Sequence, residues 1–227
     1  MGVVKARRDR RDSRWDTHRE QRRGQLVGAA VTAIRRDGAG VGMDEIAASA
    51  ATSKTVVYRH FGDRAGLYTA ICESVAGVLL AEVRRATAEA STGPGAGPRA
   101  AVAAGIDAYL RLIEIDPELY RFVVHRPLLA QGAARRAGTG DTPDPVNDMV
   151  SVIGDEVAGA IAGYLPPAAG TGAARFWGHA IVGLVRGAAD DWLARPDGTT
   201  REQLTAHLTD LAWSGLSGLA SPVEVQP

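Results

Sequence analysis

The chain has 227 residues, 26 basic and 26 acidic side chains and one cysteine, Cys72. A single cysteine excludes a disulfide framework within the chain and a zinc site built from several thiolates. The length allows one large domain or two small ones with a substantial core. Without an apolar run of about 18 residues or a signal-peptide h-region, the sequence indicates a soluble, cytoplasmic protein.

The charges are unevenly distributed along the chain. Residues 1–70 carry 14 basic and 8 acidic side chains, whereas residues 71–227 carry 12 basic and 18 acidic side chains. A basic N-terminal third joined to an acidic remainder indicates that a polyanion is bound at one end only. Residues 1–16 hold six basic and three acidic side chains with almost no apolar periodicity, so we expect a flexible basic arm. It could follow DNA phosphates or enter a minor groove, or it could be a solvated tail.

Helical signals dominate from Thr17 onward. Thr17 can cap a helix that runs to about Arg36. The apolar spacing then predicts a short helix over 43–50, another ending near Phe61 and a longer one over about 64–90. Ser53 and Asp63 are placed to cap the third and fourth of these helices. Glycine and proline signals then separate helices at about 98–115, 117–137 (interrupted near Pro127), 145–165, 173–195 and 200–220. The fold class is therefore all-α, with about nine helices.

The two short helices have the shape of a helix-turn-helix. The second spans about eight residues, or about 12 Å, which suits a major groove of about 12 Å width. Val57 and Phe61 share the face that must be buried, which leaves a polar and basic surface on the remaining face. Arg and Lys can reach guanine edges or phosphates, a threonine methyl or valine can meet a thymine methyl, and Tyr and His can contact phosphate. An ordinary solvated helix face is the alternative.

The helix-turn-helix and the start of the next helix carry a set of residues at a characteristic spacing: Ile46, Ala47, Ala50, Ser53, Tyr58, His60, Phe61, Leu67 and Tyr68. In these residues the chain resembles the DNA-binding domain of the TetR family of transcriptional regulators. It implies an N-terminal DNA-binding domain and C-terminal helices that form a ligand pocket and a dimer interface. The DNA-contacting residues that it implies are Ser53, Lys54, Thr55, Val56, Tyr58, Arg59, His60 and Arg64.

Three positions depart from the usual family pattern. Gly42 replaces a threonine that often begins the second helix and touches phosphate. Ala51 stands where the turn commonly has glycine, and a left-handed conformation there would cost about 1–2 kcal/mol. Thr52 replaces a typical buried aliphatic residue. These departures bear on the geometry of the turn.

The C-terminal helices hold most of the aromatic residues, with a few polar groups among them. This composition suits a small, mainly apolar ligand oriented by one or two hydrogen bonds, although aromatics at helical spacing are also typical of a filled core. The candidate ligand-binding residues are Tyr109, Leu112, Tyr120, Phe122, Val123, His125, Met149, Ile153, Phe176, Trp177 and His179. Nothing fixes His125 and His179 as neighbours, so we expect no metal, and no cofactor motif is recognised.

The last two helices have apolar arcs wider than one buried side requires. Two buried sides indicate a partner, most simply the same helix pair from a second subunit in a four-helix bundle. The candidate interface residues are Leu184, Ala188, Trp192, Leu204, Leu208, Leu211 and Gly215. A fully covered internal core is the alternative.

The sequence therefore predicts a homodimeric transcriptional regulator, most simply a ligand-relieved repressor on a palindromic DNA operator. The predicted domains are a basic arm (1–16), a helix-turn-helix domain (17–62) and a ligand-binding and dimerisation domain (63–227). The partners are double-stranded DNA, a second copy of the chain and a small apolar effector, with no membrane. The alternatives are an architectural DNA-binding protein indifferent to sequence, and an enzyme that uses the helix-turn-helix only for docking. No catalytic constellation supports the enzyme.

Overall fold

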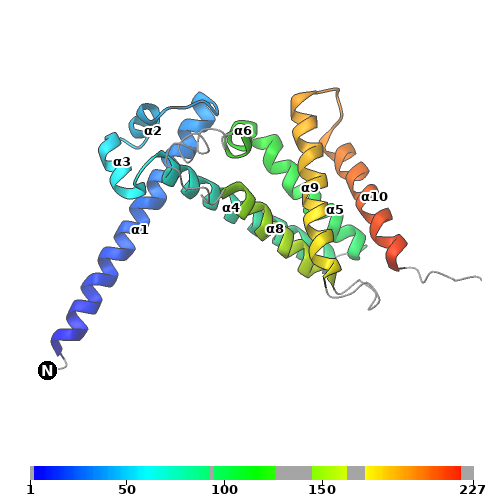
Figure 1. The fold of residues 1–227 in the computed structure, drawn as a ribbon, viewed down its shortest axis with the longest axis horizontal. Helices are drawn as coiled ribbons and strands as arrows, with labels where there is room; N and C mark the ends of the chain where they lie inside the picture. Colours follow the sequence, from blue (N-terminus) through cyan, green and yellow to red (C-terminus); the bar gives the residue numbers. More distant parts are fainter. Residues whose placement is uncertain (1–2, 93–94, 126–144, 163–171, 221–227) are drawn as a thin grey trace, which may run out of the picture. The chain divides into compact units, whose positions relative to one another are not determined.

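The computed structural model describes residues 3–92, 95–125, 145–162 and 172–220, which form nine helices (Figure 1). Over these residues the chain contains no strand, and the predicted all-α class is confirmed. The chain divides into two compact units. The first comprises Met1–Ser74 and Glu118–Ala133, and the second comprises Val75–Pro117 and Ala134–Pro227.

The first unit contains the helix-turn-helix. Its helices are α1 (Val3–Asp37), α2 (Met43–Ser49), α3 (Lys54–Phe61), the start of α4 (Arg64–Thr92) and nearly all of α6 (Pro117–His125). Apolar side chains from each helix form its core, among them Leu26, Ile34, Ile46, Val57, Leu67, Ile71 and Phe122. Burial of side chains of this size stabilises a fold by about 1.5–3 kcal/mol each, so the core holds the short helices α2 and α3 in place.

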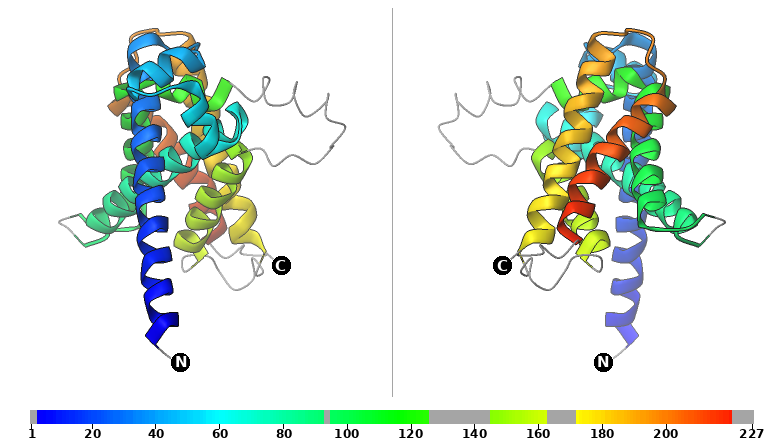
Figure 2. Two further views of the ribbon diagram at one scale, coloured as in Figure 1. Left: turned by 90° about the vertical axis from the view of Figure 1, so that its left-hand side faces the viewer. Right: turned by 90° about the vertical axis from the view of Figure 1, so that its right-hand side faces the viewer.

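Helix α1 is longer than the sequence analysis predicts. The expected start was Thr17, after a flexible arm, but α1 begins at Val3 and continues through that segment (Figure 2). The predicted end near Arg36 agrees with the observed end at Asp37. The prediction took Thr17 as the N-cap, but Thr17 lies inside α1, so this cap is wrong. The apolar periodicity of the sequence begins only near Leu26 and therefore gave no signal for the earlier start.

The second unit is a bundle formed by the rest of α4 with α5 (Pro98–Ile115), α8 (Pro145–Ala162), α9 (Ala173–Ala194) and α10 (Arg201–Ala220). In it, α8 packs on α9 and α10 packs on α5. The predicted starts at 98, 145 and 173 agree with these bounds. The predicted interruption near Pro127, the loop 138–144 and the helix end near 165 lie outside the described residues.

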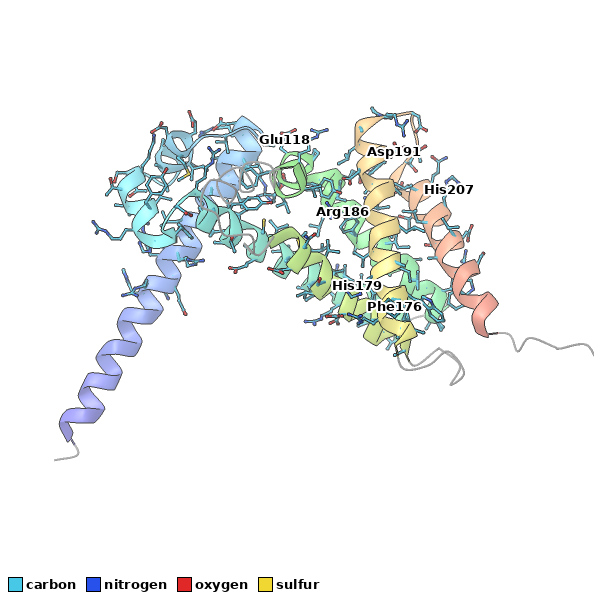
Figure 3. The ribbon with its side chains drawn as sticks, in the orientation of Figure 1. Glu118, Phe176, His179, Arg186, Asp191 and His207 are labelled. Carbon is cyan, nitrogen blue, oxygen red and sulfur yellow. The ribbon has the colours of Figure 1, made fainter. Side chains whose placement is uncertain are left out.

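Helices α8 and α9 approach closely at a pair of glycines. A Cβ on Gly178 would lie 2.5 Å from the carbonyl oxygen of Gly154 and 2.6 Å from the nitrogen of Ala158. A Cβ on Gly154 would lie 2.8 Å from Cγ of the His179 ring, which sits between the two helices (Figure 3). Because these two glycines have no side chain, α8 and α9 can pack at this short separation.

Ion pairs connect the other helices of the bundle. Arg201 at the start of α10 binds Asp107 at 2.9 Å and Glu114 at 2.6 Å, both on α5. Arg84 on α4 binds Glu156 on α8. These contacts cross-link helices that are far apart in sequence.

Helix α4 is also the one described helix that is long and apolar enough to cross a membrane by length and composition alone. One third of its most apolar 18-residue window is buried inside the structure. Core helices of soluble proteins have the same properties, so this is weak evidence for a membrane segment.

Candidate DNA-binding site and ligand cavity

The turn between α2 and α3 is held by local hydrogen bonds. The Ser53 hydroxyl oxygen accepts from the backbone N–H of Val56 at 3.4 Å, which confirms Ser53 as the N-cap of α3. The backbone N–H of Thr52 donates to the carbonyl of Ala47 at 3.0 Å. Ala51 has φ +47° and is the one non-glycine residue with positive φ in the described chain. The anticipated left-handed conformation at this position is therefore present.

Helix α3 presents a polar face and buries an apolar one. Val57 is fully buried and Phe61 nearly so. The predicted DNA-contacting residues lie on the rest of the helix surface. Lys54, Thr55, Tyr58 and Arg59 are exposed, and Val56 and His60 are half-buried. The structure thus brings these residues together on one accessible surface.

The Lys54 side chain forms an ion pair with a carboxylate of its own chain. Its ammonium lies 2.6 Å from Oδ2 of Asp44 on α2. Hydrogen bonding to Asp44 raises the pKa of Lys54 above its ordinary value. The Lys54 ammonium is therefore engaged by Asp44 in the absence of DNA, and a contact with DNA would have to compete with this ion pair.

Arg64 is exposed at the start of α4, close to the end of α3 in sequence. Asp63 caps α4, since its Oδ1 accepts from the N–H of Gly66 at 2.8 Å. A Cβ on Gly66 would lie 2.0 Å from the carbonyl oxygen of Phe61. Glycine at this position therefore allows the end of α3 to pack directly on α4.

Sequence reasoning missed a group of arginines on α1. Arg23 places its guanidinium 4.7 Å from the centroid of the Phe61 ring and donates to the carbonyl of His60 at 3.3 Å. Arg19 lies on the same helix, three residues before Arg22 and four residues before Arg23. The clue was available, because residues 19–23 fall within the basic N-terminal third.

These arginines act on His60 together with Arg59. Burial is the largest cause that lowers the pKa of His60 below its ordinary value, and repulsion from Arg22, Arg19, Arg59 and Arg23 lowers it further. Four guanidinium groups that each lower the pKa of His60 indicate a positive potential at this end of α3. Such a site suits an anion such as a DNA phosphate.

Helix α6 contacts the turn that follows α1 (Figure 3). Glu118 Oε2 accepts from the backbone N–H of Ala39 at 2.9 Å, and Oε1 accepts from Arg121 at 2.5 Å. The first of these bonds is the largest cause that lowers the pKa of Glu118 below its ordinary value. Gly38, with φ +84°, forms the turn that brings Ala39 to this carboxylate.

A second contact links α6 to α4. The Tyr68 hydroxyl donates to the carbonyl of Val123 at 2.6 Å, and its ring lies 5.8 Å from the ring of Phe122. Both contacts are buried. Within the first unit, α6 is therefore attached to the turn after α1 and to the start of α4.

The second unit contains a cavity of about 440 Å³ that is partly open to solvent. Helices α4, α5, α8, α9 and α10 contribute its walls, which are mostly aliphatic. The residues that line it include Leu79, Val83, Arg84, Thr87, Val102, Ile106, Tyr109, Ile153, Glu156, Val157, Ile161, Val182, Val185 and Trp213. This volume falls within the range of small-molecule sites, about 300–1,000 Å³.

Of the candidate ligand-binding residues, Tyr109 and Ile153 line this cavity. Phe122 and Val123 are instead buried in the core of the first unit. The remaining candidates with described side chains are not among the residues that line the cavity: Leu112, Tyr120, Met149, Phe176, Trp177 and His179. The side chain of His125 lies outside the described residues.

The candidate interface residues divide between open and covered positions. Leu211 is 59% exposed and Gly215 is exposed, whereas Leu208 is buried within its own chain. Leu184, Ala188 and Leu204 are half-buried, as is Trp192, whose indole N–H donates to the carbonyl of Thr199 at 2.8 Å. Sequence periodicity could not separate Leu208 from its neighbours, because it does not show which side of α10 faces α5.

Family models match both parts of the chain. Residues 26–71 match the model for bacterial regulatory proteins of the tetR family, and residues 85–225 match the Tetracyclin repressor-like C-terminal domain. An HTH-type transcriptional regulator from Mycobacterium tuberculosis is 31% identical over 220 residues, which cover 96% of this chain and 86% of that protein. The HTH-type transcriptional activator FasR from Mycolicibacterium smegmatis is 31% identical over 59% of this chain and 60% of its own length.

Solved structures share the fold at lower identity. A TetR-family transcriptional regulator from Streptomyces coelicolor aligns with a TM-score of 0.59 and 21% identity, covering 88% of this chain and 82% of that one. The fatty acid degradation regulator FadR from Bacillus halodurans aligns with a TM-score of 0.61 and 13% identity, covering 84% and 93% respectively.

Proposed function

Because this chain belongs to the TetR family of bacterial regulatory proteins, we propose that it is a homodimeric repressor released from its operator by a small apolar ligand. As a family member it is a DNA-binding transcriptional regulator and not an enzyme. The proposal adds the sign of regulation, the dimer, the ligand and a cytoplasmic location. It also keeps the predicted division into a DNA-binding domain and a ligand-binding domain.

The accessible face of α3 carries the DNA-binding part of the proposal. Thr55, Tyr58 and Arg59 are exposed, while Val57 and Phe61 hold the opposite face in the core. A helix fixed in this way can enter a major groove without rearrangement. Arg59 is suited to a guanine edge, and Tyr58 to a phosphate oxygen.

The arginines of α1 extend the proposed contact surface to the phosphate backbone. Arg22 and Arg23 lie near His60, at the end of α3. Phosphate contacts of this kind set the orientation of the recognition helix and make binding dependent on salt.

Open faces of α9 and α10 support the homodimer. Exposed small residues, Ala180, Gly183 and Gly187, follow one side of α9, and Leu211 and Gly215 are exposed on α10. A Cβ at any of the three glycines would meet nothing within 4 Å in the same chain. A second copy could therefore approach these backbones closely and cover Leu211.

The cavity and α4 support regulation by a ligand. The division between the two units falls within α4, between Ser74 and Val75. Residues from Leu79 onward line the cavity, and Arg64 begins the same helix in the DNA-binding unit. A ligand that favours one position of α4 changes the spacing of the two recognition helices in the dimer. A shift from 1:99 to 99:1 needs about 5.5 kcal/mol of differential affinity.

Selection of binding sites from random duplex DNA, repeated at two salt concentrations, tests the DNA-binding part. We expect a two-fold symmetric consensus, as a dimeric reader requires. A flat sequence preference with a steep salt slope would contradict the proposal and favour the architectural alternative.

A reporter gene placed behind the selected site tests the sign of regulation. We expect lower expression with the protein than without it. The relative FasR is named as an activator, so an increase would overturn repression and leave DNA binding in place.

A further inference from the structure

The charged groups in the wall of the cavity form a closed pair. Arg84 comes from α4 and Glu156 from α8. Arg84 Nε donates to Glu156 Oε1 at 2.7 Å, and a terminal guanidinium nitrogen donates to Oε2 at 2.6 Å. Both carboxylate oxygens are thus engaged in a two-pronged contact, the strongest geometry for this pair of groups.

The pair leaves the wall without net charge. Arg84 is the one cation and Glu156 the one anion among the described residues that line the cavity. The Thr87 hydroxyl, which also lines the cavity, donates a hydrogen bond to the carbonyl of Val83 on the same helix at 2.9 Å. The rest of the lining is largely aliphatic, so a ligand meets apolar surface and a guanidinium that already has its partner.

A ligand carboxylate would have to compete with Glu156 for Arg84. Glu156 is held in place by its own helix, so its effective concentration at the guanidinium is high. The Arg84 side chain is 56% exposed and that of Glu156 is 37% exposed, so the pair lies on a solvent-accessible part of the wall. An anion that does not displace Glu156 would lie beside a like charge, a cost that solvent screening reduces but does not remove. A neutral molecule encounters neither cost.

We propose that the effector is a neutral, largely apolar molecule and that the Arg84–Glu156 pair rejects carboxylates. The inference rests on the proposed function, since it assumes that the cavity is the effector site. It adds the charge of the ligand and the residues that select it. Removal of the Glu156 charge should convert the site to one that accepts an anion.

Calorimetric titration of the full-length protein with 1-decanol and with sodium decanoate at pH 8 tests this inference. The two probes share a chain and differ in the charge of the head group. We expect the unaltered protein to bind decanol at least about tenfold more tightly than decanoate, a ratio that corresponds to about 1.4 kcal/mol. Equal or tighter binding of decanoate would overturn the inference, and so would failure of both probes to bind.

Variants assign the selectivity to the ion pair. Glu156→Gln frees Arg84 and should raise the affinity for decanoate about tenfold relative to the affinity for decanol. The double variant Arg84→Gln with Glu156→Gln removes both charges and should restore the preference for decanol. Glu89→Gln is the matched control, because Glu89 pairs with Arg85 on the same helix, away from the cavity wall. An unchanged ratio in Glu156→Gln would overturn the inference.

DNA binding measured on the same preparations separates the two proposals. If DNA is bound at a two-fold symmetric site but decanoate is preferred, the ligand inference fails and the regulator remains. If no sequence preference is found, the proposed function itself fails.

Discussion

Ala51 occupies the most strained backbone position in the DNA-binding turn. Its φ of +47° lies in the left-handed region, which costs a residue with a Cβ about 1–2 kcal/mol. We expect Ala51→Gly to raise the free energy of unfolding by up to about 1 kcal/mol, because the gain is partly offset by the greater freedom of glycine in the unfolded chain.

Urea denaturation measures this effect, and Ala50→Gly is the matched control. Ala50 has φ −85°, so glycine relieves no strain there and should lower the stability by about 0.5–1 kcal/mol. Equal destabilisation by the two variants would contradict the interpretation of Ala51.

Glu118 fixes the turn after α1 through a charged acceptor. We expect Glu118→Ala to lower the free energy of unfolding by about 1 kcal/mol at pH 7, a value reduced by solvent screening because the side chain is 36% exposed. Because the folded-state pKa of Glu118 is lowered from 4.5, its contribution is fully present above pH 4.5 and is lost as the pH falls through the folded pKa.

Denaturation curves recorded from pH 7 to pH 3 test this pH dependence. The difference in the free energy of unfolding between Glu118→Ala and the unaltered protein should become smaller as the pH falls below 4.5. Glu20→Ala, at an exposed position of α1 in the same unit, should show little difference at any pH. A difference in the free energy of unfolding between Glu118→Ala and the unaltered protein that stays constant to pH 3 would argue against a role for the carboxylate charge.

At the scale of single helices, α1 and α3 are expected to contribute differently to DNA binding. Arg59→Ala on α3 should cost about 1–3 kcal/mol of binding free energy and relax the preference at one base position, since we propose that Arg59 contacts a base edge. Arg22→Ala on α1 should weaken binding to all sequences alike, since we propose that Arg22 contacts phosphate. It should also reduce by about 1 the slope of the logarithm of the binding constant against the logarithm of the salt concentration.

Binding isotherms on the selected site and on single-base variants of it, at several salt concentrations, distinguish these effects. Gln21→Ala is a control on α1, at an exposed uncharged position. If Arg59→Ala weakens binding to every sequence equally, Arg59 contacts phosphate and base recognition must come from other residues of α3.

The sequence predicted the helices of the first unit best where local chemistry determines their ends. The caps at Ser53 and Asp63 are confirmed by hydrogen bonds to Val56 and Gly66. The start of α1 was missed, because the residues before Thr17 have no apolar periodicity from which a helix could be identified. Charge pattern and helix propensity, which do not require a core contact, were the signals left unused there.

At the scale of the whole molecule, the proposed dimer predicts that a larger side chain on the exposed face of α9 weakens dimer formation. Gly187 is exposed and a Cβ there meets nothing in its own chain. Gly187→Leu should favour the helix by about 1 kcal/mol within a subunit, yet hinder the close approach of a second copy. We expect a shift from dimer to monomer and loss of tight binding to the two-fold symmetric site.

Sedimentation analysis combined with operator binding tests this expectation. Gly77→Leu is the matched control, since Gly77 is also an exposed helical glycine with open space around it, on α4 rather than α9. A Gly187→Leu protein that remains dimeric would place the interface elsewhere.

The sequence by itself determined the helical class, most helix bounds, the caps of α3 and α4 and the family resemblance. These features depend on contacts between residues close in the chain, so spacing and residue type suffice to predict them. Only the tertiary structure decided the rest. It shows that Arg23 stacks on Phe61, that Phe122 and Val123 are buried in the core of the first unit, and that Arg84 pairs with Glu156 in a cavity wall. Such contacts join residues that are distant in sequence, and the periodicity of one helix does not show which neighbour it faces.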